Sequence, residues 1–199
     1  MKGTGPIGAV LAGGRGRRIG GEKATVEIAG RPLVCYPIDA LREVVEEVVV
    51  VVKADTELPE MVGVSAVWVE PDGIFHPLAG IVHALRMAAG RPVLACAGDL
   101  PLVTPEVLRA VLDARLDDAP AVIARAGGRL QPLVGLYTPL ALAGLSGYAP
   151  DAPTREVVEA LGAAVVDVED ADAFYNVNAP EDVLQASALL SARAAHEAS

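Results

Sequence analysis

Glycines and cationic side chains are concentrated between Leu11 and Lys23, in the sequence LAGGRGRRIGGEK. Glycine lets a backbone approach a ligand closely and adopt positive φ. Successive N–H groups in such a loop can bind an anion. Arg18 can contact two phosphate oxygens at once, whereas the ammonium of Lys23 is a compact point charge. The segment therefore predicts a site for a small molecule that carries phosphate.

Two common phosphate-binding loops do not match this segment. A Walker loop requires Ser or Thr after Gly-Lys, and residues 22–24 read EKA. A dinucleotide-binding loop requires the spacing G-x-G-x-x-G, whereas Gly14, Gly16 and Gly20 have one extra residue in the second interval. The acidic residue expected about 20 positions later, at the end of a second strand, is also missing. Neither of these two loop types therefore accounts for the segment.

A carboxylate, Asp99, follows the apolar run at residues 93–97. In open α/β sheets, ligands bind beyond the carboxyl ends of the strands. Carboxylate oxygens are also preferred ligands of Mg²⁺. An aspartate in this position could instead cap a helix or stabilise a turn, but with the glycine-rich loop present we favour metal binding.

The composition favours an interior of buried strands flanked by helices. The chain has 199 residues, 52% hydrophobic but only 4% aromatic, which is enough for one domain, residues 1–199, with a full core. The two cysteines, Cys35 and Cys96, lie in apolar segments without C-x-x-C spacing. We expect both to be buried, reduced thiols of a cytoplasmic protein.

The net charge of −10 excludes a typical nucleic-acid-binding protein, which needs basic surface. No apolar run reaches the roughly 20 residues that a membrane span requires, and the N-terminal apolar stretch is too short for a signal peptide. Four of the 16 basic residues nevertheless fall between positions 15 and 23. This cluster is either an ordinary solvated patch or a site for a compact polyanion.

Apolar runs alternate with amphipathic stretches along most of the chain. We expect extended segments at 7–11, 24–28, 48–52, 66–70, 93–97, 121–125, 130–137 and 164–168. Helices are expected at 33–45 and 78–89, and further helices begin after Thr104, at Pro139, at Thr154 and at Pro180. The alternation predicts a mainly parallel, three-layer α/β sheet. The glycines at 127–128 indicate a hairpin, and hence at least one antiparallel strand.

Several short motifs, in order, resemble the MobA-like NTP transferases, and among them the molybdenum cofactor guanylyltransferases. The first block comprises LAGG at 11–14, RIG at 18–20, Lys23 and GRPL at 30–33, with Ile19 in place of the usual Met. The later blocks are PLAG at 77–80, GDLP at 98–101, QPL at 131–133 and NVNAPE at 176–181. The first block is specific to this family. Each later block is weak evidence alone, but together they occur in the family's order. The resemblance spans nearly the whole chain and implies a Rossmann-like nucleotidyltransferase fold.

The resemblance also implies roles for individual residues. The residues that it implies for nucleotide binding are Leu11, Ala12, Gly13, Gly14, Lys23 and Asp99. An acidic residue after the third strand, either Glu70 or Asp72, completes that set. Catalysis falls on Arg18, Lys23 and Asp99, with Asp99 binding the cofactor Mg²⁺. Acceptor binding falls on Gln131, Asn176 and Asn178, although asparagines before a helix that begins with proline are also ordinary capping residues.

The reaction implied is transfer of GMP from GTP to the terminal phosphate of molybdopterin, with release of pyrophosphate and transient contact with molybdoenzymes. Two departures from the family pattern stand out: His76 replaces a usual glycine, and no asparagine occurs at Val51 or Val52. Because of these departures, a non-catalytic regulator that binds nucleotide remains an alternative function. A sister enzyme that uses CTP or another phosphorylated acceptor is the nearer alternative, although LAGG favours GTP because cytidylyltransferases tend to have LAAG.

Overall fold

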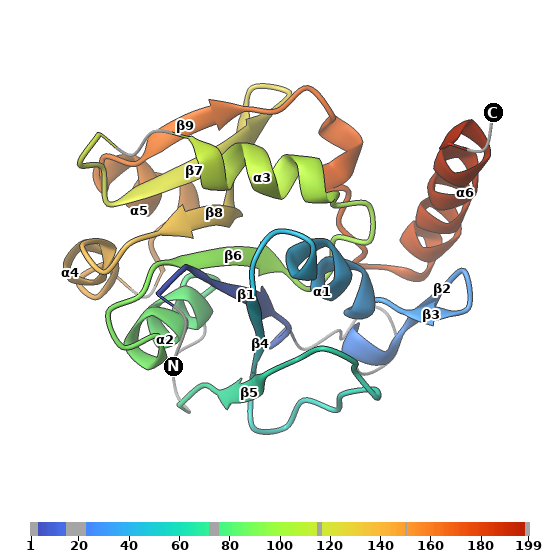
Figure 1. The fold of residues 1–199 in the computed structure, drawn as a ribbon, viewed down its shortest axis with the longest axis horizontal. Coiled ribbons are helices and arrows are strands. Elements are labelled where there is room, and N and C mark those ends of the chain that lie inside the picture. Colours follow the sequence, from blue (N-terminus) through green and yellow to red (C-terminus); the bar gives the residue numbers. More distant parts are fainter. Residues whose placement is uncertain (1–3, 15–22, 72–75, 115–116, 150, 198–199) are drawn as a thin grey trace.

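The computed structural model describes residues 4–14, 23–71, 76–114, 117–149 and 151–197. A seven-stranded sheet with the order β5-β4-β1-β6-β8-β7-β9 forms its centre (Figure 1). All pairings in this sheet are parallel except those of β8, which runs antiparallel to both β6 and β7. The mainly parallel α/β sheet with an antiparallel strand is thus confirmed.

The bounds of the elements follow the apolar pattern closely. The strands of the large sheet are β1 (Ile7–Leu11), β4 (Glu47–Val52), β5 (Ala66–Val69), β6 (Val93–Ala97), β7 (Ala121–Ala126), β8 (Arg129–Tyr137) and β9 (Ala164–Asp167). A separate hairpin contains β2 (Glu27–Ile28) and β3 (Arg31–Pro32). The α-helices are α1 (Cys35–Arg42), α2 (Ala79–Met87), α3 (Pro105–Asp113), α4 (Ala141–Leu145), α5 (Thr154–Ala160) and α6 (Pro180–Glu197). Short 3₁₀ turns are η1 (Lys23–Thr25) and η2 (Ala171–Phe174).

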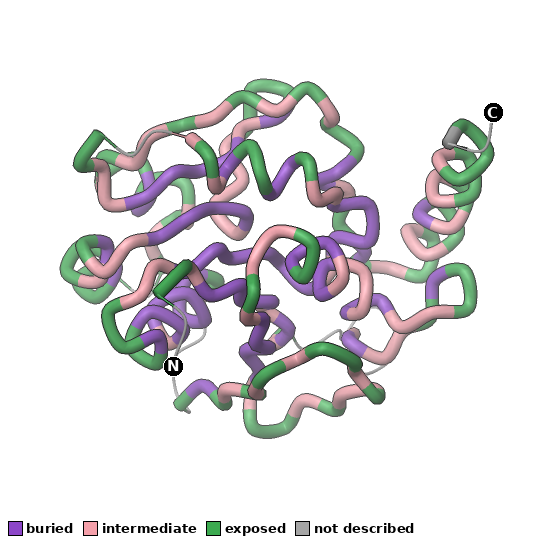
Figure 2. The backbone as a smooth tube through the Cα atoms, viewed as in Figure 1, coloured by how far each residue is buried: buried purple, intermediate pink, exposed green. Residues whose placement is uncertain are grey.

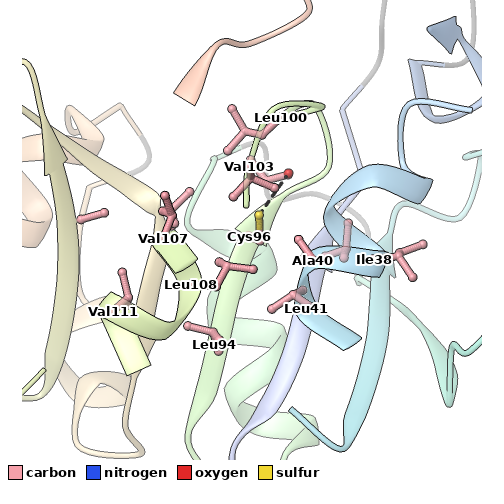
Figure 3. Packing of buried hydrophobic residues seen from close by; sticks show 14 of the residues in the cluster. Ile38, Ala40, Leu41, Leu94, Cys96, Leu100, Val103, Val107, Leu108 and Val111 are labelled. Carbon is pink, nitrogen blue, oxygen red and sulfur yellow. Dashed lines mark hydrogen bonds between the residues drawn. The ribbon is translucent and has the colours of Figure 1, made fainter. Parts of the chain in front are cut away.

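The central strands are buried on both faces, as Figure 2 shows. Successive strand residues point to opposite faces, so Val10 packs in one apolar cluster and Ala9 in the other. Side chains of α1 and α3 complete the first cluster, where they surround Leu94 and Cys96 of β6 (Figure 3). Helices α2, α4 and α5 complete the second cluster. The result is the three-layer arrangement expected from the sequence.

The pairing of β7 with β8 is interrupted by a bulge. Gly127 and Gly128 have φ of 53° and 75° and form the turn. Ile123 pairs with Gly135 but the next residue of β7 pairs with Gln131, so residues 132–134 have no partners in β7. Pro132 lies in this unpaired stretch. Proline has no backbone N–H, and at a bulge this interrupts no hydrogen bond between the strands.

Three local expectations were wrong. Residues 24–28 do not form one extended segment, because the Val26 N–H donates to Lys23 O at 3.4 Å and closes the η1 turn before β2 begins. Helix α1 is shorter than the expected 33–45, since the chain turns at Glu43. Cys35, at the start of α1, is only partly buried, whereas Cys96 is buried as expected.

Helix α6 lies at the side of the molecule, next to the β2–β3 hairpin (Figure 1). A small apolar cluster that includes Ile28, Val177 and Ala186 joins the two. Arg193 near the other end donates to Leu102 O at 2.8 Å. Among the residues with described positions, no helix combines the length and apolar character needed to cross a membrane.

Candidate functional site

A cavity of about 650 Å³ opens at the carboxyl ends of β1, β4 and β6. This is where a parallel α/β sheet is expected to bind its ligand. Its walls combine the start of the glycine-rich loop, charged residues that follow strands, and the turn before α2. The lining residues are Leu11, Ala12, Gly13, Gly14, Lys23, Ala24, Lys53, Glu70, His76, Pro77, Gly80, Ala97, Gly98, Asp99 and Leu133.

The loop after β1 is fixed where it leaves the sheet. The Ala12 N–H donates to Val51 O at 2.8 Å, and the Gly98 N–H donates to Leu11 O at 2.9 Å. A Cβ atom at Gly98 would lie 2.9 Å from that same oxygen of Leu11, so only glycine allows the two backbones to come this close. Gly13 is similarly restricted, because a Cβ there would lie 3.0 Å from Oε1 of Glu70.

Lys23 connects two segments that are far apart in the sequence. Its Nζ lies 2.7 Å from Oδ2 of Asp99 and donates to Oδ1 of Asn178 at 2.6 Å. The side chains of Lys23 and Asp99 are 15% and 21% exposed. The Val177 N–H also donates to Asp99 O at 3.0 Å, so the segment before α6 contacts the backbone of Asp99 as well as the Lys23 ammonium.

The second oxygen of the Asp99 carboxylate, Oδ1, is buried and has no hydrogen-bond partner within the described part of the chain. Buried carboxylate oxygens normally accept hydrogen bonds or bind cations, so this atom has unused capacity. Nearby, burial and then the negative charge of Asp99 raise the pKa of the Cys96 thiol far above its usual range. Cys96 therefore remains a neutral thiol that packs beside the site.

A second ion pair in the cavity joins Lys53 and Glu70. Lys53 directly follows β4, and its Nζ lies 2.6 Å from Oε2 of Glu70. Their side chains are 15% and 8% exposed. The sequence analysis named Glu70 but missed Lys53. Its position after a buried strand, in a chain with only three lysines, was the signal that could have identified it.

His76 links the cavity wall to the α4–α5 connection. Its Nδ1 accepts a hydrogen bond from the Leu78 N–H at 3.1 Å, and its Nε2 lies 2.9 Å from Ala152 O. Because a carbonyl can only accept, Nε2 carries the proton and the ring is the neutral Nε2–H tautomer. The Tyr148 ring lies beside it, with centroids 4.2 Å apart. His76 is therefore held in place by protein contacts while it lines the cavity.

The cavity brings together most of the residues expected to bind nucleotide. These are Leu11, Ala12, Gly13, Gly14, Lys23, Glu70 and Asp99. Arg18 and Asp72 lie outside the described residues. The choice between Glu70 and Asp72 is therefore not decided, although Glu70 lines the cavity.

The three residues expected to bind the acceptor are dispersed. Gln131 lies on β8 and is not among the lining residues. Asn176 donates from Nδ2 to Phe174 O at 3.1 Å. The side chain of Asn178 contacts Lys23, and Asp182 caps α6 by accepting from the N–H groups of Asn178 and Ala179 at 2.7 and 2.8 Å. The acceptor roles stay predictions.

Fold and site together indicate the class of nucleotidyltransferases: the sheet is mainly parallel, a glycine-rich loop follows β1, and two Lys–carboxylate pairs line the cavity at the carboxyl edge. The comparison with known families agrees. A family model, the MobA-like NTP transferase domain, matches residues 8–166. The chain belongs to this family.

Relatives cover almost the full length of the chain. The molybdenum cofactor guanylyltransferase of Cereibacter sphaeroides is 35% identical over 191 residues, which cover 92% of this chain and 96% of the relative. A probable molybdenum cofactor guanylyltransferase of Thermococcus kodakarensis is 34% identical over 194 residues, covering 89% and 92%. Among solved structures, molybdopterin-guanine dinucleotide biosynthesis protein A of Archaeoglobus fulgidus superposes with a TM-score of 0.68 at 25% identity, covering 93% of this chain and 98% of that one.

Proposed function

We propose that this nucleotidyltransferase is a molybdenum cofactor guanylyltransferase, which transfers GMP from GTP to the terminal phosphate of molybdopterin. The observation that carries the proposal is the cavity in which the loop at 11–14, Lys23 and Asp99 meet. The names of the relatives from Cereibacter sphaeroides and Archaeoglobus fulgidus supply the substrates. Contact with molybdoenzymes and a cytoplasmic location remain predictions.

The chemistry requires positioning and charge stabilisation more than proton transfer. An oxygen of the acceptor phosphate attacks the α-phosphorus of GTP, and the bond from that phosphorus to the bridging oxygen of the β-phosphate breaks. Pyrophosphate leaves with the electron pair. A phosphate is already an anion at neutral pH, so the reaction needs no strong general base. The barrier is repulsion between anions, which donors and cations fixed in the site reduce.

Residues of this chain meet that requirement in the proposed complex. Gly13 and Gly14 line the cavity where the loop leaves β1, and we assign their N–H groups to the phosphates, because the Ala12 N–H is already bound to Val51 O. Lys23 balances charge that grows on the α-phosphate and on the leaving pyrophosphate. Arg18 has the same proposed role from within the loop.

The charges of the cavity are consistent with a divalent cation. Among its described lining residues, the ammonium groups of Lys23 and Lys53 are matched by the carboxylates of Asp99 and Glu70. A triphosphate therefore brings negative charge that these four groups do not offset. The described residues contain no cluster of three or more His, Cys, Asp or Glu side chains that could hold a metal by themselves. Mg²⁺ commonly uses only one or two carboxylates together with substrate phosphates.

Asp99, with its unpartnered buried oxygen, fits the role of that single carboxylate ligand. When bound, Mg²⁺ would screen the repulsion between the reacting anions.

We assign the Lys53–Glu70 pair to the guanine base. A carboxylate can accept from the N1–H and the 2-amino group of guanine, and an ammonium can donate to O6. Adenine presents an acceptor at N1 and a donor at N6, which is the opposite arrangement. Both residues line the cavity that we assign to the nucleotide.

The test is product formation with purified protein, molybdopterin, Mg²⁺ and each of the four nucleoside triphosphates. We expect molybdopterin guanine dinucleotide and pyrophosphate from GTP, and at least about tenfold lower kcat/KM with the other nucleotides. Asp99→Asn should lose turnover by about 100-fold or more while keeping its circular dichroism spectrum. Asp113→Asn, at an exposed position at the end of α3, is the matched control. Preferential use of CTP, or near-normal turnover by Asp99→Asn, would overturn the assignment.

A further inference from the structure

Neither oxygen of the Asp99 carboxylate is accessible to a cation in the arrangement that the structure shows. Oδ2 is in contact with the Lys23 ammonium at 2.7 Å. Oδ1 is buried below the surface. A magnesium ion must approach a carboxylate oxygen to about 2.1 Å and brings waters with it. The ammonium occupies the space that such an ion would need.

Lys23 is held in this position from two sides. Asn178 accepts from its Nζ at 2.6 Å, although 155 residues separate the two in the sequence. The N–H of Asn178 is in turn bound by Oδ2 of Asp182 in the first turn of α6. The Lys23 ammonium is therefore fixed by the start of α6 as well as by Asp99.

A divalent cation and the ammonium cannot share Asp99 without strong repulsion. Two positive charges a few ångströms apart in a partly buried site repel each other strongly, because little water is present to screen them. Moving Lys23 away without a new partner is also unfavourable, since it would leave a buried charge uncompensated. A polyphosphate provides such a partner, because it offers the ammonium several anionic oxygens in place of one carboxylate.

We propose that Lys23 is an exchangeable counter-ion of Asp99, so that a divalent cation binds Asp99 only when a nucleotide's phosphates have taken over the ammonium. The inference rests on the proposed function, because it takes Asp99 as the metal ligand. Asn178 is then a positioning residue that keeps Lys23 on Asp99, rather than a contact to the acceptor. The coupling is reciprocal: the cation strengthens nucleotide binding by the same factor as the nucleotide strengthens cation binding.

The experiment is a titration of the nucleotide-free protein with Mn²⁺, followed by electron paramagnetic resonance of the unbound ion. Wild-type protein should bind Mn²⁺ weakly. Lys23→Met and Lys23→Gln, which remove the positive charge, should each bind it at least about tenfold more tightly. Lys23→Arg keeps the charge and should remain weak. Adding Asp99→Asn to Lys23→Met should restore weak binding, which places the ion on Asp99.

Two results would overturn the inference. One is equal Mn²⁺ affinity in wild type and in both neutral variants. The other is tight binding that persists in the Lys23→Met/Asp99→Asn double variant, because the ion would then lie elsewhere. The titration contains no nucleotide and measures no turnover. A failed guanylyl-transfer assay therefore refutes the proposed reaction without altering the Mn²⁺ pattern, whereas equal affinities refute the exchange and leave turnover with GTP intact.

Discussion

Lysine is rare in this chain, and both lysines beyond the N-terminus line the cavity. Lys23 contacts Asp99, and Lys53 contacts Glu70. Each pair is largely shielded from water. Removing one partner therefore leaves an unpaired charge in a poorly solvated position, which destabilises the protein. Replacing one of these side chains therefore changes the electrostatics of the whole cavity, and its matching carboxylate has to be considered in any interpretation.

His83 on α2 is a single residue whose burial should affect the pH dependence of stability. Its Nε2 is buried without a hydrogen-bond partner within the described part of the chain, and burial lowers its pKa below the usual 6.5. The charge of Glu70 opposes this shift, whereas the charges of Arg86 and Lys53 add to it. In the folded protein, His83 is therefore harder to protonate than in the unfolded chain.

The direction of the pH effect follows from this difference. Above about pH 6.5 the imidazole is neutral in both states and stability is unaffected; as the pH falls below that value the unfolded chain takes up the proton more readily, and stability decreases. One proton contributes a slope of at most about 1.4 kcal/mol per pH unit. His83→Gln should remove this part of the loss, as judged from urea unfolding at pH 5.5 and 7.5. His196→Gln, on the exposed part of α6, is the matched control. An unaltered slope in His83→Gln would contradict the prediction.

Single residues of the site were predictable from the sequence only where the signal was local. The glycines at 13–14 and the carboxylate at Asp99 follow apolar strands, so their place at the edge of the sheet could be predicted. The partners of Lys23 could not, because its contact to Asn178 depends on how α6 packs. Lys53 had a local signal that was not used.

At the level of elements, α6 shows how a helix terminus supports the site. Asp182 accepts from the N–H groups of Asn178 and Ala179, which have no partner within the helix. These backbone hydrogen bonds lower the pKa of Asp182, because they favour the charged carboxylate. The cap thereby fixes the residue that contacts Lys23.

Asp182→Ala should destabilise the protein by about 1 kcal/mol, the usual cost of losing a helix cap. The amide protons of residues 178 and 179 should also exchange faster with solvent. Chemical unfolding and hydrogen exchange measure the two effects. Glu181→Ala is the control, because it removes a first-turn charge but no bond of the cap, and its exchange rates at 178 and 179 should match wild type. Equal exchange in Asp182→Ala and wild type would show that the cap does not order this segment.

Strands and helices were predicted well because their apolar periodicity is strong. All seven strands of the large sheet begin within one residue of the expected position, and Thr104 caps α3 by accepting from the Val107 N–H at 3.4 Å. The failures have tertiary causes. Lys23, the first residue of the η1 turn, contacts Asp99 and Asn178, and the bulge in β8 depends on its pairing with β7. Neither leaves a periodic pattern in the local sequence.

For the molecule as a whole, the central question is how an acidic chain binds a polyanion. The net charge is −10, and the described cavity pairs each ammonium with a carboxylate. We therefore propose that binding of a triphosphate depends on loop amides, on the arginines at positions 15–18 and on a cation. Such a site suits one compact ligand and is unsuited to a nucleic-acid backbone, which requires an extended basic surface.

A crystal structure with Mg²⁺ and a non-hydrolysable GTP analogue tests this account most directly. We predict that the triphosphate lies against the N–H groups of residues 13–14, with the Lys23 ammonium on a phosphate oxygen and the metal ion bound to Asp99. An analogue bound outside this cavity, or a triphosphate bound there while Lys23 remains on Asp99 and the metal contacts other residues, would contradict it.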